Sequence, residues 1–317
     1  MARFLTRRLL QAVPVLLGIS FLLFVLMHAM PGGPLAMYVQ QPGMSKDRLA
    51  QLAVQMGLNK PVWVQYTEWL AGVLHGNFGY SYIYNEPATT MMLQRFPATM
   101  ELMLTAFVVS VVGSFALGIF GAVRQYSIWD HLITTLSYFG MAMPTFWLGV
   151  LMLILFAVDL HWFPSGGLSS STGPSGLGDR LRHLVLPAST LAVFLIAQQS
   201  RYVRSAMLEV IRADFVRTAR AKGLGERVIM WRHALRNALI PVVTVMVINA
   251  AFLFGGALVT ETIYSWPGMG LLFINAIQQA DYPVIMAIVS FLSVVIVFAN
   301  IVADMLYGLL DPRVRLS

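Results

Sequence analysis

Long apolar runs separated by shorter polar segments dominate the pattern of hydrophobic and polar positions along this chain. A helix of about 20 apolar residues crosses the roughly 30 Å of hydrocarbon in a bilayer. One run is less regular and contains Pro187, Gln198 and Gln199, which suits a helix buried among others. The runs cover residues 9–30, 98–123, 132–158, 184–200, 242–259 and 284–306. The pattern therefore predicts an all-α integral membrane protein with six transmembrane helices.

The longest region between two runs, residues 31–97, predicts a small helical insert. Ser45 is placed to cap one helix, and a second helix is expected to begin after Pro61, with Tyr66 and Trp69 on its packing face. The predicted parts are an N-terminal end with the first span (1–30), an extracytoplasmic insert (31–97), a five-helix core (98–311) containing a cytoplasmic loop (201–236), and a cytoplasmic tail (312–317).

The composition supports a membrane location and excludes several other classes of protein. The chain is 58% hydrophobic and 11% charged, whereas soluble domains contain about 25% charged residues. Its formal charge of +7 comes from basic residues beside the apolar runs, without a recognised DNA-binding motif, so we expect no nucleic-acid partner. With no cysteine, disulfides and thiolate metal sites are excluded.

Basic residues also predict the orientation of the chain in the membrane. Arg3, Arg7 and Arg8 precede the first run, and the largest group of basic residues lies in the loop 201–236. Because Lys and Arg are enriched in cytoplasmic loops, this loop and the N-terminus are expected in the cytoplasm. Six spans then return the C-terminus to the same side.

The loop between the fourth and fifth runs contains a short predicted helix. Asp214 is expected to cap its first turn, and Gly223 to end it in a left-handed conformation. About eight helical residues, roughly 12 Å, are marginally stable alone, so the helix needs a surface to pack against. Beyond it, the spacing predicts one packing face made of Val228, Trp231, Leu235 and Ala238. Pro241 is expected to disturb the following turn.

The order of residues in this loop resembles that of a known family. Residues 217–223, Arg-Thr-Ala-Arg-Ala-Lys-Gly, are similar to the cytoplasmic coupling loop of inner-membrane permease subunits of binding-protein-dependent ABC importers, in the form of the dipeptide and oligopeptide branch. The general family pattern has Glu-Ala-Ala where this chain has 217–219. Segments 57–81, 143–149 and 260–283 are also similar to that branch. The coupling residues that the resemblance implies are Asp214, Phe215, Arg217, Thr218, Ala219, Arg220, Ala221, Lys222 and Gly223.

The resemblance implies a type I ABC importer permease fold in the bacterial cytoplasmic (inner) membrane, with both termini in the cytoplasm. It implies a second homologous permease subunit, two ATPase subunits that dock on the loop, an extracytoplasmic substrate-binding protein and surrounding lipid. Dipeptides or oligopeptides are the expected substrates. The alternatives are nickel or glutathione in the same permease role, and a stand-alone secondary transporter, which would instead show an inverted repeat or midplane charged pairs.

The sequence does not predict an enzyme. It contains no Gly-x-x-x-x-Gly-Lys-Ser/Thr loop for nucleotide phosphates, no His-Glu-x-x-His zinc pair and no Gly-x-Ser-x-Gly nucleophile turn. We therefore expect this chain to bind no cofactor or metal, and expect ATP and Mg²⁺ on the ATPase subunits.

Polar residues and prolines within the predicted spans are candidates for a translocation path or gate, because unpaired polar groups are costly in hydrocarbon. Pro144 is expected to kink the third span. The amides and hydroxyls of the fourth and fifth spans either line the path or form interhelical hydrogen bonds. Near the outer mouth of the path, Glu261 is placed to meet a peptide's amino terminus. Tyr264 and Trp266, which follow it, suit interfacial anchors equally well. The candidates are Pro144, Phe146, Trp147, Gln198, Gln199, Thr244, Asn249 and Glu261.

Overall fold

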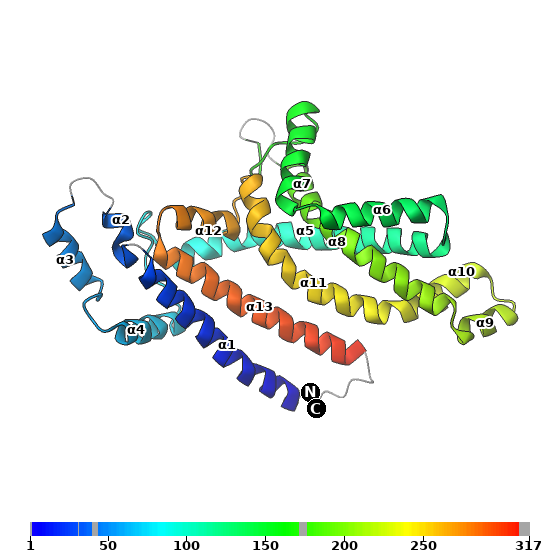
Figure 1. The fold of residues 1–317 in the computed structure, drawn as a ribbon, viewed down its shortest axis with the longest axis horizontal. Coiled ribbons are helices and arrows are strands. Elements are labelled where there is room, and N and C mark those ends of the chain that lie inside the picture. Colours follow the sequence, from blue (N-terminus) through cyan, green and yellow to red (C-terminus); the bar gives the residue numbers. More distant parts are fainter. Residues whose placement is uncertain (1, 31, 40–43, 171–175, 311–317) are drawn as a thin grey trace. The chain divides into compact units, whose positions relative to one another are not determined.

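The computed structural model describes residues 2–30, 32–39, 44–170 and 176–310. These residues are helical with irregular connections, apart from an isolated β-bridge between Tyr80 and Pro87 (Figure 1). The helices are α1 (Ala2–Ala29), η1 (Gly33–Leu35), α2 (Ala36–Val39), α3 (Lys46–Gln55), α4 (Val62–Leu74), α5 (Ala88–Val123), α6 (Ile128–Ala142), α7 (Thr145–Met152), η2 (Leu153–Asp159), α8 (Leu177–Ile211), α9 (Asp214–Ala221), α10 (Glu226–Val228), η3 (Ile229–Ala234), α11 (Leu235–Ile263), α12 (Met269–Gln278) and α13 (Tyr282–Leu310).

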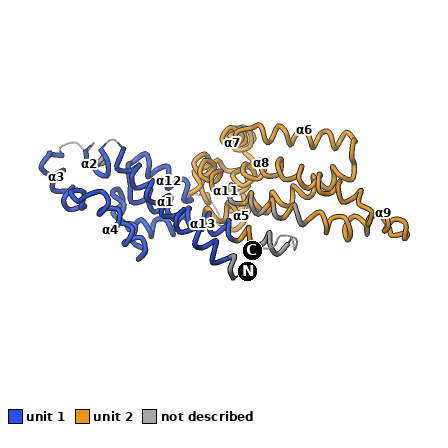
Figure 2. Tube along the Cα trace, turned by 60° about the horizontal axis from the view of Figure 1, so that its bottom comes forward, with its two compact units in different colours: residues 1–98, 268–301, 317 blue, residues 99–267, 302–316 orange. Residues whose placement is uncertain are grey.

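The chain forms two compact units (Figure 2). Unit 1 contains the described residues of 2–98 and 268–301, and unit 2 contains those of 99–267 and 302–310. The core of unit 1 joins the first turns of α5 and α13 to α12, through buried side chains such as Met92, Met269 and Ile288.

The two insert helices form as the sequence predicts. The Ser45 side chain accepts a hydrogen bond from the backbone N–H of Arg48 at 3.3 Å, which caps α3. In α4, the predicted packing face lies on α1: the ring centroids of Phe24 and Tyr66 are 5.5 Å apart, and those of Phe24 and Trp69 are 6.1 Å apart. The insert is therefore fixed to the first long helix by aromatic contacts.

A buried carboxylate connects two segments of unit 1. Asp281, just before α13, is 1% exposed. It accepts hydrogen bonds from the Ser81 hydroxyl and from the backbone N–H of Tyr82, the latter at 3.1 Å. This carboxylate therefore ties the loop after α4 to the start of α13.

In unit 2, α8 packs against α6, α7 and α11, and it crosses α5 closely at glycines. A Cβ atom at Gly118 would lie 2.6 Å from the Cβ of Val203 and 2.7 Å from the carbonyl oxygen of Ser200. A Cβ at Gly113 would lie 2.8 Å from the Cδ1 of Ile196. Small residues at such crossings let two membrane helices approach closely.

We therefore expect Gly118→Ala to destabilise unit 2 by about 1–3 kcal/mol, as overpacking does, and to lower the unfolding temperature of the purified protein in detergent. Gly255→Ala is the matched control, because Gly255 also lies within a helix and its added Cβ meets nothing within 4 Å. Equal unfolding temperatures for the two variants would contradict close packing of α5 on α8.

Several helix boundaries differ from the sequence prediction. The helix α5 begins at Ala88, ten residues before the apolar run, because Pro97 lies inside the helix and does not mark its start. The helix α8 extends well beyond 184–200 on both sides. The helix α12 was not predicted, and α11 continues through Pro241 rather than being disturbed there. Apolar runs locate the parts of helices that face hydrocarbon or core, and they miss the polar extensions.

The third predicted span is broken rather than kinked. The helix α6 ends at Ala142, Pro144 precedes α7, and the axes of the two segments differ by 106°. Among the described residues, four helices are long and apolar enough to cross a membrane, and the bent pair would be a fifth. The helix α11 covers the predicted fifth run, but several of its side chains lie outside the described residues. The count of six spans stays a prediction.

Candidate functional site

The predicted short loop helix is present as α9, with a different N-terminus. Ala213 occupies the cap position, and no side chain caps the helix. The expectation that Asp214 caps the first turn is wrong, because Asp214 is already the first helical residue and its carboxylate points outward. Its Oδ1 lies 3.4 Å from Nη1 of Arg217, with both side chains largely exposed. Such exposed pairs contribute little to stability.

The C-terminus of α9 forms as predicted. Gly223 has a φ of +76°, and its backbone N–H donates to the carbonyl of Arg220 at 2.9 Å. The N–H of Leu224 reaches the carbonyl of Ala219 at 3.3 Å. These two bonds form a Schellman motif, in which glycine is favoured because the left-handed conformation strains residues with a Cβ.

The helix α9 packs on its own chain and presents its other face to solvent. Val216 and Ala219 are buried against Ile229, with Val210 alongside. The remaining predicted coupling residues, Phe215, Arg217, Thr218, Arg220, Ala221, Lys222 and Gly223, are exposed. A helix that packs on its own chain through one face and exposes the opposite face to solvent is suited to docking another protein.

The packing face after α9 agrees with the prediction only in its second half. Ala238 is buried and Leu235 packs against the same cluster, whereas Val228 and Trp231 are exposed and Ile229 is buried in their place. Residues 229–234 form a π-helix, η3, and the wider π turn shifts the buried face relative to α-helical spacing. The spacing rule applied to the sequence assumed an uninterrupted α-helix.

An ion pair braces the turn after α9. The guanidinium of Arg220 binds the carboxylate of Glu226 through Nε at 2.7 Å and Nη2 at 3.1 Å. The hydrogen bond from Arg220 lowers the pKa of Glu226 below its ordinary value. The pair connects the end of α9 to the start of α10 across Gly223.

A second ion pair, which the sequence did not predict, fixes the C-terminal part of α8. Arg204 binds the carboxylate of Asp130 through Nε at 2.6 Å and Nη2 at 2.7 Å. The Tyr126 backbone N–H also donates to Asp130, at 2.9 Å. Because Asp130 lies in the first turn of α6 and Arg204 precedes α9 by ten residues, the pair ties the α5–α6 turn to the helix that leads into α9.

The break at Pro144 is held by a tyrosine from the end of α11. The Tyr264 hydroxyl donates to the Gly149 carbonyl of α7 at 2.9 Å and lies 2.9 Å from the Thr190 hydroxyl of α8. Phe146 and Trp147, on the same short helix as Gly149, remain 56% and 46% exposed. The bent segment therefore has one fixed face and one open face.

Two buried amides on α8 and α11 have incomplete hydrogen bonding among the described residues. The Oε1 of Gln199 accepts from the Ser114 hydroxyl at 3.3 Å, while its Nε2 and the Nδ2 of Asn249 have no partner there. Gln198 is half-buried, and the side chain of Thr244 lies outside the described residues. Buried donors without partners cost about 1–3 kcal/mol each, so these groups are candidates to bind water or substrate.

Glu261 is fully buried in unit 2 and accepts a hydrogen bond from the Thr99 hydroxyl at 2.7 Å. Tyr264 and Trp266 are also buried. The interpretation of these two aromatic residues as interfacial anchors is therefore wrong, because such anchors expose one end to the headgroup region. They pack the corner that follows α11 instead.

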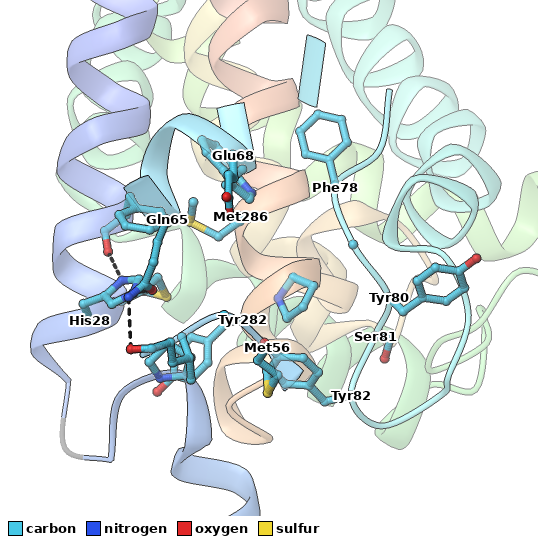
Figure 3. Close-up of a pocket in the computed structure, with 18 of the residues that line it drawn as sticks. His28, Met56, Gln65, Glu68, Phe78, Tyr80, Ser81, Tyr82, Tyr282 and Met286 are labelled. Carbon is cyan, nitrogen blue, oxygen red and sulfur yellow. Dashed lines mark hydrogen bonds between the residues drawn. The ribbon is translucent and has the colours of Figure 1, made fainter. Parts of the chain in front are cut away.

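Unit 1 also contains an aromatic pocket of about 670 Å³ (Figure 3). His28 connects two of its walls: Nδ1 lies 2.8 Å from the Phe24 carbonyl, and Nε2 lies 2.9 Å from Oε1 of Gln65. Burial raises the pKa of Tyr82, another lining residue, and the neighbouring Tyr38 and Asp281 add to that shift. Among the described residues, no group of three or more acidic or histidine side chains could hold a metal ion.

Comparison with known proteins places both halves of the chain in one family. Residues 114–316 match the sequence model of the binding-protein-dependent transport system inner membrane component, and residues 1–103 match the model of the N-terminal part of such membrane components. The two matches together cover nearly the whole chain.

Similar proteins include three peptide permeases. The chain is 41% identical to the oligopeptide transport system permease protein AppB of Bacillus subtilis (strain 168), over 99% of this chain and 100% of AppB. It is 37% identical to the dipeptide permease DppB of Escherichia coli (strain K12), and 38% identical to the di/tripeptide permease DppB of Pseudomonas aeruginosa (strain UCBPP-PA14), each over 99% of both chains.

A solved structure supports the fold. The inward-facing MetNI methionine ABC transporter matches with a TM-score of 0.56 and 17% identity, covering 70% of this chain and 96% of the transporter chain.

Proposed function

The chain belongs to the family of inner membrane components of binding-protein-dependent transport systems, and on that premise we propose that it is the permease subunit of an ATP-driven peptide importer. Its substrates are dipeptides or oligopeptides, and a second related permease subunit completes the path. One observation carries the proposal: full-length identity of 37–41% to permeases named for dipeptide and oligopeptide transport. This chain is not itself the enzyme, and the ATPase subunits bind ATP and Mg²⁺.

The outer face of α9 is the docking site for an ATPase subunit. Its inner face, Val216 and Ala219, rests on Ile229, so a push on α9 moves η3 and the end of α8 with it. Because α8 is one continuous helix of 35 residues, the motion reaches Gln199 and the Tyr264 contact at the bent α7. Opening one side at a time requires that ATP and substrate bind the two states with different affinities.

We expect the loop that contains α9 to face the cytoplasm and the insert to face outside. Because the chain has no native cysteine, single changes Ser45→Cys, Ser170→Cys and Ser205→Cys can be labelled in intact cells with a membrane-impermeant maleimide. The first two should react from outside, and Ser205→Cys only after the cells are permeabilised. Labelling of Ser205→Cys in intact cells would reverse the orientation.

Native mass spectrometry of the complex purified from its own membrane tests the subunit role. We expect masses for one copy of this chain, a related permease and two ATPase subunits, and no ATP hydrolysis by this chain alone. A chain that purifies without ATPase subunits yet transports, or that hydrolyses ATP by itself, would contradict the proposal.

A further inference from the structure

An apolar groove of about 940 Å³ lies in unit 2, between the last turns of α5 and the segment where α10 continues into η3 and α11. Phe115, Ile119 and Leu239 are among the side chains that line it. Trp231 also lines the groove and remains 60% exposed. Apolar surface gathered in a concave site indicates an apolar occupant.

Two arginines lie in or next to the groove. Arg227 lines it directly. The guanidinium carbon of Arg124 lies 4.9 Å from the ring centroid of Phe120, another lining residue. The acid that lines the groove, Glu226, already binds Arg220 through two hydrogen bonds. The two arginines are therefore available to an anion.

We propose that this groove binds an anionic phospholipid of the cytoplasmic leaflet, with an acyl chain along Phe115 and Ile119 and the phosphate at Arg124 and Arg227. The groove lies where α5 ends and the exposed residues around α9 begin, and an exposed tryptophan is typical of the boundary between hydrocarbon and water. Basic pockets between membrane helices on the cytoplasmic side suit anionic headgroups. Naming the leaflet rests on the proposed orientation, whereas lipid binding does not depend on which substrate the importer carries.

Photocrosslinking of the assembled importer tests this site. Vesicles of phosphatidylethanolamine are prepared with a trace of phosphatidylglycerol or phosphatidylcholine carrying the same photoreactive acyl chain, and mass spectrometry maps the labelled peptides. We expect residues 115–123 and 230–239 to be labelled more strongly by phosphatidylglycerol. Each arginine contributes about a fivefold preference, so Arg124→Gln with Arg227→Gln should remove most of it.

Arg232→Gln is the matched control, because Arg232 is exposed on η3 but does not line the groove. It should keep the preference for phosphatidylglycerol. Equal labelling by the two lipids, or a preference that survives the loss of both groove arginines, would overturn the proposal. So would the absence of label from both lipids, because the groove would then be covered by protein. The crosslinking is measured without any transport assay. Its result therefore does not depend on which substrate the importer carries.

Discussion

Replacing Ala219 by proline is expected to abolish transport while the chain still inserts in the membrane. Proline removes one helical hydrogen bond and its ring clashes with the preceding turn, at about 3 kcal/mol in a helix interior. The helix α9 has only eight residues, and Ala219 is one of the two that bury its inner face. The helix should therefore unfold, and the ATPase subunits should either detach or hydrolyse ATP without stimulation by substrate.

Ala219→Gly is the comparison that separates loss of the helix from loss of a side chain. Glycine costs only about 1 kcal/mol in a helix, so this variant should keep most transport. Both variants should show normal membrane levels, because position 219 lies outside the apolar runs. Full transport by Ala219→Pro would mean that α9 only orients the chain, and its coupling role would be withdrawn.

Removing the carboxylate of Asp130 is expected to produce the largest loss of folding stability among the ion-pair changes considered. The Asp130 side chain is 3% exposed and that of Arg204 is 27% exposed. Breaking a buried pair costs about 3–5 kcal/mol because the remaining charge has no partner. The partial exposure of Arg204 places Asp130→Ala near 3 kcal/mol. The expected result is a clearly lower unfolding temperature of the purified protein.

The double variant Asp130→Ala with Arg204→Ala should recover part of that stability, because neither charge then remains unpaired. Glu68→Ala is the matched control, since Glu68 pairs with Lys60 at 2.6 Å but both side chains are about half exposed. Such a pair contributes at most about 1 kcal/mol. If Asp130→Ala and Glu68→Ala lowered the unfolding temperature equally, the pair would not brace α8.

Features governed by local chain chemistry were predictable from the sequence. Ser45 caps α3, and Gly223 ends α9 in a left-handed turn. The spacing from Asp214 to Gly223 predicted about eight helical residues, and α9 has eight. A disturbance at Pro144 was also expected, but as a kink within one helix and not as a break with a 106° bend. Each of these depends on one or two residues and their nearest neighbours.

Features set by distant contacts were not predictable. Asp130 meets Arg204 across 74 positions, and Tyr264 meets Gly149 across 115. No spacing rule within one helix reveals such partners. The buried face around Ile229 was misassigned for a different reason: the sequence does not mark where a π turn replaces an α turn. The polar candidates Gln199 and Asn249 were found from composition, and the structure adds their burial and unpaired donors.

ATP-driven uptake of a labelled dipeptide into proteoliposomes tests the central claim most directly. The vesicles contain this chain, its related permease and the ATPase subunits, with the cognate binding protein on the extracytoplasmic side and ATP on the other. We predict accumulation that requires ATP, the binding protein and this chain, and that disappears with Ala219→Pro. Uptake by this chain alone, driven by an ion gradient without ATP, would contradict the account and identify a secondary transporter.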